Sequence, residues 1–380
     1  MLVHVGLCVS GGTMIKTTIA LTAMAFVAAW APSDAIAAER SVQQRYQLEE
    51  AATPLREQAG WRKPKRILVI GAEPGIVEQL EADSPGVEFL RASSPAEALT
   101  LAKDADALVG ACSPAILEAG KSIRWVQVYN AGVEGCVSVP ALRERDILVT
   151  NMQRIMGPVI AEHATAMMLA LTRRLDAFIP AQRERAWRPQ AAEGRLTLVE
   201  GKTMLVVGLG GIGSEIARRG HALGMRVIAT RASGRTGPDF VSYVGLPDEL
   251  LKLASEADVI VNATPLTPQT TEIFDAAFFA KMKPTAYFIN IARGKSVVTS
   301  ALVDALESGK IAGAGLDVTE PEPLPPDHPL WKFSNVIITP HVAGRSHLGF
   351  SAQMDVVVEN VKRYVAGDRM LSVVDLSRGY

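Results

Sequence analysis

The chain has few cysteines, few aromatic residues and almost no net charge. Its 380 residues include three cysteines, Cys8, Cys112 and Cys136, and none of them forms the CxxC spacing of a thiolate zinc site. Aromatic residues make up 6% of the chain and the formal net charge is −1. So little charge creates no overall field that would attract nucleic acid or an anionic membrane surface. We therefore expect a globular protein with no metal site and no nucleic-acid partner.

The cysteines allow two interpretations. An odd number is a poor disulfide framework, and the apolar and glycine-rich surroundings of Cys112 and Cys136 are typical of buried free thiols. Removal of Cys8 with a leader would leave two cysteines that could pair with each other. We expect free thiols and keep a Cys112–Cys136 disulfide as the alternative.

Long apolar runs are also missing, apart from a short one near the N-terminus. The segment from Met14 has Lys16, an apolar run over 19–31 and a small-x-small site at 35–37. This is the layout of a secretory signal peptide, and the run is shorter than the roughly 20 residues of a membrane-spanning helix. We therefore predict a leader over 1–37, a periplasmic or secreted protein, and no membrane span in the mature chain. A cytoplasmic protein with an unprocessed tail is the alternative.

Short apolar strands alternate with helical stretches over the rest of the chain, as in parallel βαβ units. Helical patterns at 158–179 and 349–365 flank the second of two strand series. We predict an α/β fold with two Rossmann-like, doubly wound parallel-sheet domains. The cofactor domain, 156–344, is inserted into a substrate domain, 66–155 and 345–375. The expected strands are 66–70, 87–90, 107–110 and 125–128, then 203–208, 226–230, 258–264, 286–292, 312–318 and 335–340.

A glycine-rich turn indicates that the second series binds a dinucleotide. The turn lies between an expected strand and an expected helix, and its cofactor-binding residues are Gly208, Gly210, Gly211, Ile212 and Gly213. Gly208 permits the tight turn, Gly210 lets the backbone approach a pyrophosphate, and Gly213 lets the helix pack on the strand. The N–H groups at the start of the helix favour phosphate.

The next strand lacks the terminal acidic residue that binds the ribose 2′-hydroxyl in NAD sites. Arg231 occupies that place, and Ser233 and Arg235 follow before the first carboxylate, Asp239. Arginine pairs with phosphate through two parallel charged hydrogen bonds. We therefore predict a preference for NADP(H), with NAD(H) as the second cofactor; a solvated basic turn is the alternative.

Three further motifs each follow an expected strand. They are Asn290-Ile291-Ala292-Arg293-Gly294, then the segment from Gly315 through Asp317 to Glu322-Pro323, then Thr339-Pro-His341-Val-Ala-Gly344. In this order they resemble the D-isomer-specific 2-hydroxyacid dehydrogenases, and the stretch 314–331 is most similar to the glyoxylate/hydroxypyruvate reductases. The resemblance covers residues 66–370.

The resemblance implies a role for each matching residue. Arg293 would bind the substrate carboxylate, Glu322 would pair with the histidine, and His341 would donate and accept the proton. The loop Ala131, Gly132 and Val133 would hold the substrate carboxylate through backbone N–H groups. Further cofactor contacts would come from Thr264, Pro265, Ile291, Ala292, Asp317, His341 and Gly344. The implied activity is reduction of small 2-keto acids, such as glyoxylate and hydroxypyruvate, to D-2-hydroxy acids by a homodimer.

Reduction of a 2-keto acid by hydride transfer requires the same residue types. Negative charge develops on the carbonyl oxygen as hydride arrives, and a histidine can protonate that oxygen. An arginine clamps the carboxylate of the substrate and polarises its carbonyl. Glu320 is the alternative partner of the histidine, and we interpret His163 as structural. The alternative function is a non-catalytic protein that senses a dinucleotide or an acid outside the cytoplasm, because a fold does not fix a function.

Overall fold

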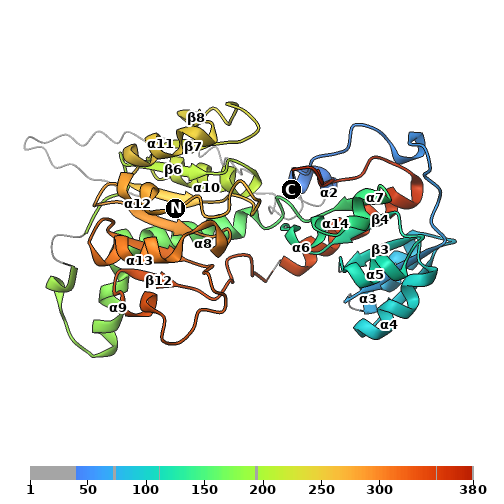
Figure 1. The fold of residues 1–380 in the computed structure, drawn as a ribbon, viewed down its shortest axis with the longest axis horizontal. Helices are drawn as coiled ribbons and strands as arrows, with labels where there is room; N and C mark the ends of the chain where they lie inside the picture. Colours follow the sequence, from blue (N-terminus) through green and yellow to red (C-terminus); the bar gives the residue numbers. More distant parts are fainter. Residues whose placement is uncertain (1–39, 72–73, 111, 193–195, 348, 379–380) are drawn as a thin grey trace, which may run out of the picture. The chain divides into compact units, whose positions relative to one another are not determined.

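The computed structural model describes residues 40–71, 74–110, 112–192, 196–347 and 349–378 (Figure 1). The predicted leader, 1–37, lies outside the described residues. Two parallel sheets, of five and seven strands, form the framework of the described chain. The prediction of an α/β fold with two doubly wound parallel sheets is therefore confirmed.

The five-stranded sheet has the order β2-β1-β3-β4-β5. The strand order reverses between β1 and β3, and open parallel sheets bind ligands beyond the carboxyl ends of their strands at such a point. Strands β3 and β4 are buried along their whole length, as expected for a sheet covered on both faces. The strands are β1 (Arg66–Ile70), β2 (Glu88–Ala92), β3 (Ala107–Gly110), β4 (Trp125–Val128) and β5 (Leu148–Thr150). The helices along this part of the chain are α3 (Pro74–Asp83), α4 (Pro95–Leu101), α5 (Pro114–Ala119), α6 (Glu134–Val137) and α7 (Pro140–Glu144).

The seven-stranded sheet has the order β12-β11-β10-β9-β6-β7-β8, so its order reverses between β6 and β9. The glycine turn follows β6 and therefore lies at the switch point. The strands are β6 (Thr203–Val207), β7 (Arg226–Thr230), β8 (Tyr243–Gly245), β9 (Val259–Asn262), β10 (Tyr287–Asn290), β11 (Gly313–Leu316) and β12 (Val336–Ile338). The helices are α8 (Gly157–Thr172), α9 (Leu175–Arg183), α10 (Gly211–Ala222), α11 (Leu250–Glu256), α12 (Ala276–Lys281) and α13 (Thr299–Glu307).

The single helix expected over 158–179 is two helices, so that prediction was wrong. Helix α8 ends at Thr172, and α9 begins at Leu175. Between them Arg174 takes a left-handed backbone with φ of 55°, which ends a right-handed helix. Its buried guanidinium lies 3.0 Å from the carboxylate of Asp176, so the break is stabilised by an ion pair that helical periodicity does not reveal.

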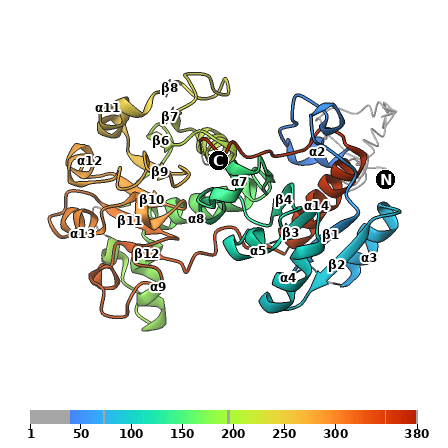
Figure 2. The same ribbon diagram turned by 45° about the vertical axis from the view of Figure 1, so that its right-hand side comes forward.

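Two segments far apart in the sequence complete the core of the five-stranded sheet. Helix α14 (Gly349–Ala366) lies beside the strands of this sheet (Figures 1 and 2). Its buried valines belong to this core. Leu48 and Leu55, which precede the range 66–155 predicted for this domain, are buried in the same cluster near α2 (Val42–Tyr46). The division into a substrate domain and a cofactor domain stays a prediction, because residues 41–380 form one compact unit.

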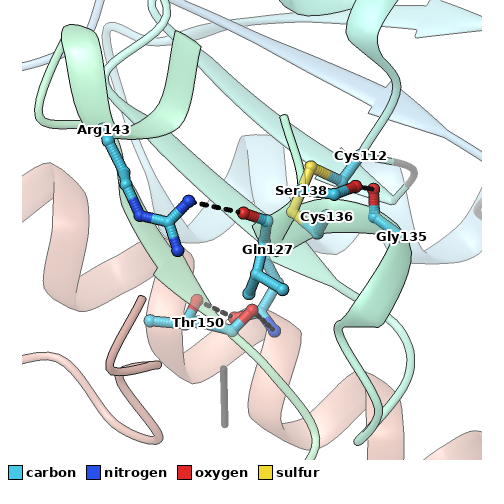
Figure 3. The surroundings of a disulfide bond; sticks show 8 residues. Cys112, Gln127, Gly135, Cys136, Ser138, Arg143 and Thr150 are labelled. Carbon is cyan, nitrogen blue, oxygen red and sulfur yellow. Dashed lines mark hydrogen bonds between the residues drawn. A yellow bond between two sulfur atoms is a disulfide. The ribbon is translucent and has the colours of Figure 1, made fainter. Parts of the chain in front are cut away.

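Cys112 and Cys136 form a disulfide, so the expectation of free thiols was wrong (Figure 3). Their Cα atoms lie 5.3 Å apart across a sequence separation of 24 residues. Strands β3 and β4 are neighbours, and each cysteine follows one of them, which brings the two thiols together at the carboxyl edge of the sheet. The apolar surroundings are real, since Cys136 is buried, but they do not discriminate between a thiol and a half-cystine.

Candidate active site

The glycine turn after β6 has the geometry of a phosphate-binding turn. Gly208 has a φ of 96°, a conformation that favours glycine. A Cβ on Gly213 would lie 2.0 Å from the Gly208 carbonyl oxygen, so only glycine lets α10 pack this closely. At Gly210, in contrast, no described atom lies within 4 Å of the place of a Cβ. The turn therefore has open space where a pyrophosphate would approach the start of α10, and its residues fit a dinucleotide.

The basic residues after β7 separate into two groups. The backbone N–H groups of Gly208 and Leu209 donate to the Thr230 carbonyl, so the end of β7 lies beside the glycine turn. Arg231 Nε donates to Ser233 Oγ at 2.8 Å, which brings these two residues together as predicted for a 2′-phosphate pocket. Arg235 is instead engaged by the Glu249 carboxylate at 2.6 Å and by the Tyr243 hydroxyl at 3.0 Å.

Glu249 is the residue that sequence reasoning missed here. The Tyr243 hydroxyl and the Leu246 N–H donate to its carboxylate, and with Arg235 they lower the pKa of Glu249 to about 2. Its charge is therefore present at any physiological pH and competes with a cofactor phosphate for Arg235. No local pattern in the sequence links position 249 to position 235.

Two buried asparagines fix the conformation of the loops that follow β9 and β10 through hydrogen bonds. Asn262 Oδ1 accepts from the backbone N–H and the hydroxyl of Thr264, which fixes the predicted ribose-binding loop before Pro265. The side-chain amide of Asn262 donates to Asn290 Oδ1 at 3.0 Å and to Ser296 Oγ at 2.8 Å. A polar residue at the end of each apolar strand was the available signal for Asn262 and for the positioning role of Asn290.

The same network holds the backbone of Arg293. Asn290 Nδ2 and Ser296 Oγ both donate to its carbonyl oxygen, at 3.0 and 2.7 Å. A Cβ on Gly294 would lie 1.9 Å from the Thr319 carbonyl oxygen. Gly294 therefore lets the arginine loop press against the segment that leads to Glu322. Ile291 and Ala292, the predicted cofactor contacts beside Arg293, are largely buried.

His341 and Glu322 form a direct pair. The ring Nδ1 of His341 lies 2.7 Å from Glu322 Oε1, and the two side chains are 48% and 41% exposed, so the pair remains open to a ligand. A carboxylate only accepts hydrogen bonds, so Nδ1 carries the proton and Nε2 is left for another partner. Of the two candidate glutamates, Glu322 is therefore the partner of His341.

Asp317 organises the loop that carries His341. Its carboxylate accepts from Thr339 Oγ1 at 2.6 Å and from the N–H groups of Val342 and Ala343, both at 2.9 Å. Its carbonyl accepts from the N–H of His341 at 2.8 Å. These contacts hold His341 in a left-handed conformation with φ of 52°, which a non-glycine residue adopts only when its surroundings enforce it. The role of Asp317 as a nicotinamide contact stays a prediction.

His163 supports this arrangement from helix α8. Its Nε2 lies 2.9 Å from Thr339 Oγ1 and 3.6 Å from Asp317 Oδ1. The interpretation of His163 as a structural residue stays a prediction. Gly344 ends the loop and has no described atom closer than 3.9 Å to the place of a Cβ.

The loop Ala131-Gly132-Val133 follows β4 at the carboxyl edge of the five-stranded sheet. Asn151 Nδ2 donates to the Ala131 carbonyl at 2.8 Å. The Val133 carbonyl accepts from the N–H groups of Cys136 and Val137, at 2.8 and 2.9 Å. The loop is therefore anchored at both ends.

Among the residues that the structure describes, no helix combines the length and the apolar character of a membrane span.

Comparison with known proteins shows which family these features belong to. The family model described as D-isomer specific 2-hydroxyacid dehydrogenase, NAD binding domain, matches residues 165–343. A glyoxylate reductase from Korarchaeum cryptofilum is 36% identical over 275 residues, which are 70% of this chain and 81% of that relative.

Two solved structures are similar over almost their whole length. A D-isomer specific 2-hydroxyacid dehydrogenase family protein from Aeromonas salmonicida is 31% identical, with a TM-score of 0.71 over 83% of this chain and 100% of that chain. An NADPH-dependent glyoxylate/hydroxypyruvate reductase from Sinorhizobium meliloti, in complex with NADP and malonate, is 31% identical, with a TM-score of 0.68 over 83% of this chain and 98% of that chain. The chain belongs to the D-isomer-specific 2-hydroxyacid dehydrogenase family and is an NAD(P)-dependent oxidoreductase.

Proposed function

We propose that this enzyme reduces small 2-keto acids of the glyoxylate and hydroxypyruvate type to D-2-hydroxy acids, with NADPH as the preferred cofactor. The observation that supports this proposal best is the His341–Glu322 pair, at 2.7 Å, with the Arg293 loop packed against the segment that leads to Glu322. The names of the relatives support the substrate class, because several are glyoxylate or glyoxylate/hydroxypyruvate reductases.

Each residue of the site has a separate role in the proposed reduction. A reduced nicotinamide supplies the hydride for the carbonyl carbon. His341 Nε2 gives its proton to the carbonyl oxygen, and Glu322 stabilises the imidazolium that holds this proton. Arg293 binds the substrate carboxylate and polarises the carbonyl, and the backbone of Ala131–Val133 holds the other side of the carboxylate.

The cofactor preference rests on Arg231 and Ser233, which lie together beside the glycine turn. A guanidinium and a hydroxyl suit a 2′-phosphate, whereas an acidic residue at this place would repel it. Arg235 contributes less than the sequence suggests, because Glu249 already neutralises it.

Initial rates of the full chain with glyoxylate, hydroxypyruvate and pyruvate, each with NADPH and with NADH, test this proposal. We expect glyoxylate or hydroxypyruvate to react fastest with NADPH, and His341→Ala to lower kcat about 10²- to 10⁴-fold. The exposed His221 on α10 provides the matched control, and His221→Ala should retain the rate. A preference for NADH would contradict the cofactor proposal alone, and equal rates in His341→Ala would contradict the mechanism.

We also propose that the mature enzyme is an exported homodimer. The leader-like segment 1–37 supports export, and so does the Cys112–Cys136 disulfide, because disulfides persist mainly in oxidising compartments. Exposed apolar side chains on α9, Leu175 and Ile179, support a self-association surface.

A further inference from the structure

We propose that the Cys112–Cys136 disulfide is a positioning element for the substrate. It ties the segment after β3 to the segment after β4, and so fixes the Ala131–Val133 backbone that receives the substrate carboxylate. The inference rests on the proposed function for the identity of the ligand. It adds a covalent anchor that the chemistry of the reaction does not itself require.

The first step of the argument is where the two sulfur atoms attach. Cys136 lies in α6, the short helix that directly continues the Ala131–Val133 loop, and its side chain is buried (Figure 3). Cys112 follows the carboxyl end of β3, next to β4 in the sheet. The crosslink therefore joins the two segments that flank the expected substrate position.

The second step is that the two ends of the loop are held in different ways. Its near end is fixed by Asn151 Nδ2 on the Ala131 carbonyl and by the N–H of Met152 on the Asn130 carbonyl. Its far end continues into α6, which has four residues and is too short to be stable by itself. Besides the disulfide, the buried side chains of Val133 and Val139 pack the ends of α6 on the core, and exposed Arg143 donates to the Val137 carbonyl at 3.1 Å. The disulfide is the covalent link among these contacts.

The third step is that Cys112 lies between two packed elements, β3 and α5. Gly110, at the end of β3, has a φ of 124°, and a Cβ there would lie 2.5 Å from the Ile70 carbonyl oxygen of β1. Gly110 is thus packed closely against β1 in the sheet. After Cys112, α5 begins at Pro114 and buries Ile116 and Leu117. The disulfide therefore connects the far end of the substrate loop to the segment between β3 and α5.

Reduction should consequently weaken substrate binding and leave the cofactor site intact. An unanchored loop must lose conformational freedom each time it receives the carboxylate, and this lowers the affinity. The predicted dinucleotide-binding residues, in contrast, all lie on the seven-stranded sheet and its loops. The inference therefore predicts a change that is confined to one of the two KM values.

The test compares the wild type with the double variant Cys112→Ser/Cys136→Ser. We expect the KM for glyoxylate to rise about tenfold, with the KM for NADPH within about twofold of the wild type. A thiol-free phosphine reductant should reproduce the effect in the wild type and should not change the double variant further. Ser255→Ala, at an exposed position on α11, is the control and should respond to the reductant as the wild type does.

Hydrogen exchange of the loop amides provides a second readout that does not depend on turnover. Faster exchange over 131–137 in the double variant than in the wild type is the expected result. Equal KM values for glyoxylate, or equal exchange, would overturn the inference. If neither protein reduces any keto acid, the proposed function fails, and the exchange measurement still decides whether the disulfide anchors the loop.

Discussion

Individual buried polar residues position the side chains that we propose to react. Asp317 is 2% exposed and joins Thr339, Val342 and Ala343 to one carboxylate. Asn262 and Asn290 do the same for the loops of Thr264 and Arg293. Each such group satisfies several backbone atoms, so its removal leaves buried donors or acceptors without partners.

Replacement of Asp317 tests this at the residue scale. Asp317→Asn exchanges one acceptor oxygen for an NH2 group that would face a backbone N–H, which costs about 1–3 kcal/mol. We expect kcat to fall about ten- to hundredfold, because the His341 loop loses its anchor. Steady-state kinetics and a thermal melt measure both effects. Asp304→Asn, on the exposed face of α13, is the control and should change neither quantity.

A second prediction at the residue scale concerns the basic residues after β7 and the KM for NADPH. Arg231→Ser should raise the KM for NADPH about ten- to hundredfold and leave the KM for NADH unchanged, because only NADPH carries the 2′-phosphate. Glu249→Gln should lower the KM for NADPH, because it releases Arg235. Kinetics with both cofactors provide the measurement.

The control for that prediction is Arg226→Ser at the other end of β7, where the arginine pairs with Glu256 at 3.1 Å. It should leave both KM values unchanged. Equal effects of Arg231→Ser on NADPH and NADH would show that Arg231 does not read the phosphate.

At the scale of elements, the glycines of the strand–turn–helix unit β6–α10 have different roles. Gly213 allows the helix to pack on the strand, and Gly210 leaves room for the phosphates. Gly213→Ala places a Cβ 2.0 Å from the Gly208 carbonyl oxygen and should separate α10 from β6. Overpacking of this kind costs about 1–3 kcal/mol and should lower the melting temperature by several degrees.

Gly210→Ala is the matched variant, because no described atom lies within 4 Å of its Cβ. We expect its melting temperature to equal that of the wild type, while NADPH binding measured by calorimetry weakens. A stable Gly213→Ala variant would show that the helix can shift at little cost. Unchanged binding by Gly210→Ala would show that the phosphates do not approach this backbone.

At the scale of the whole molecule, the exposed apolar surface of α9 bears on the assembly. Leu175 and Ile179 are 44% and 45% exposed, and Trp187 farther along is 96% exposed. We expect light scattering to give twice the mass of the chain. Leu175→Asp/Ile179→Asp should give the mass of one chain, because a charge on a buried apolar contact prevents association.

Leu251→Asp changes a leucine on α11 that is 40% exposed; it is the control and should leave the mass unchanged. A single-chain mass for the wild type would contradict the proposed dimer. N-terminal sequencing of the same preparation tests export: a mature chain beginning at Ala38 is expected, and an intact N-terminus would contradict it.

The sequence by itself determined the two parallel sheets, and it predicted the phosphate turn and the residues that we propose to react. Apolar runs of strand length and the spacing of Gly208, Gly210 and Gly213 are local properties, so they can be interpreted without the fold. The motifs around Arg293, Glu322 and His341 each follow a strand, and parallel topology brings strand ends to one edge.

Only the tertiary structure decided which side chains actually meet. Arg235 pairs with Glu249, and Cys112 forms a disulfide with Cys136. The helix expected over 158–179 is interrupted at Arg174. His163 reached Thr339 from a helix 176 positions away in the sequence. Such pairs depend on strand order and on the path of the chain between distant segments, and periodicity and turn chemistry contain no information about either.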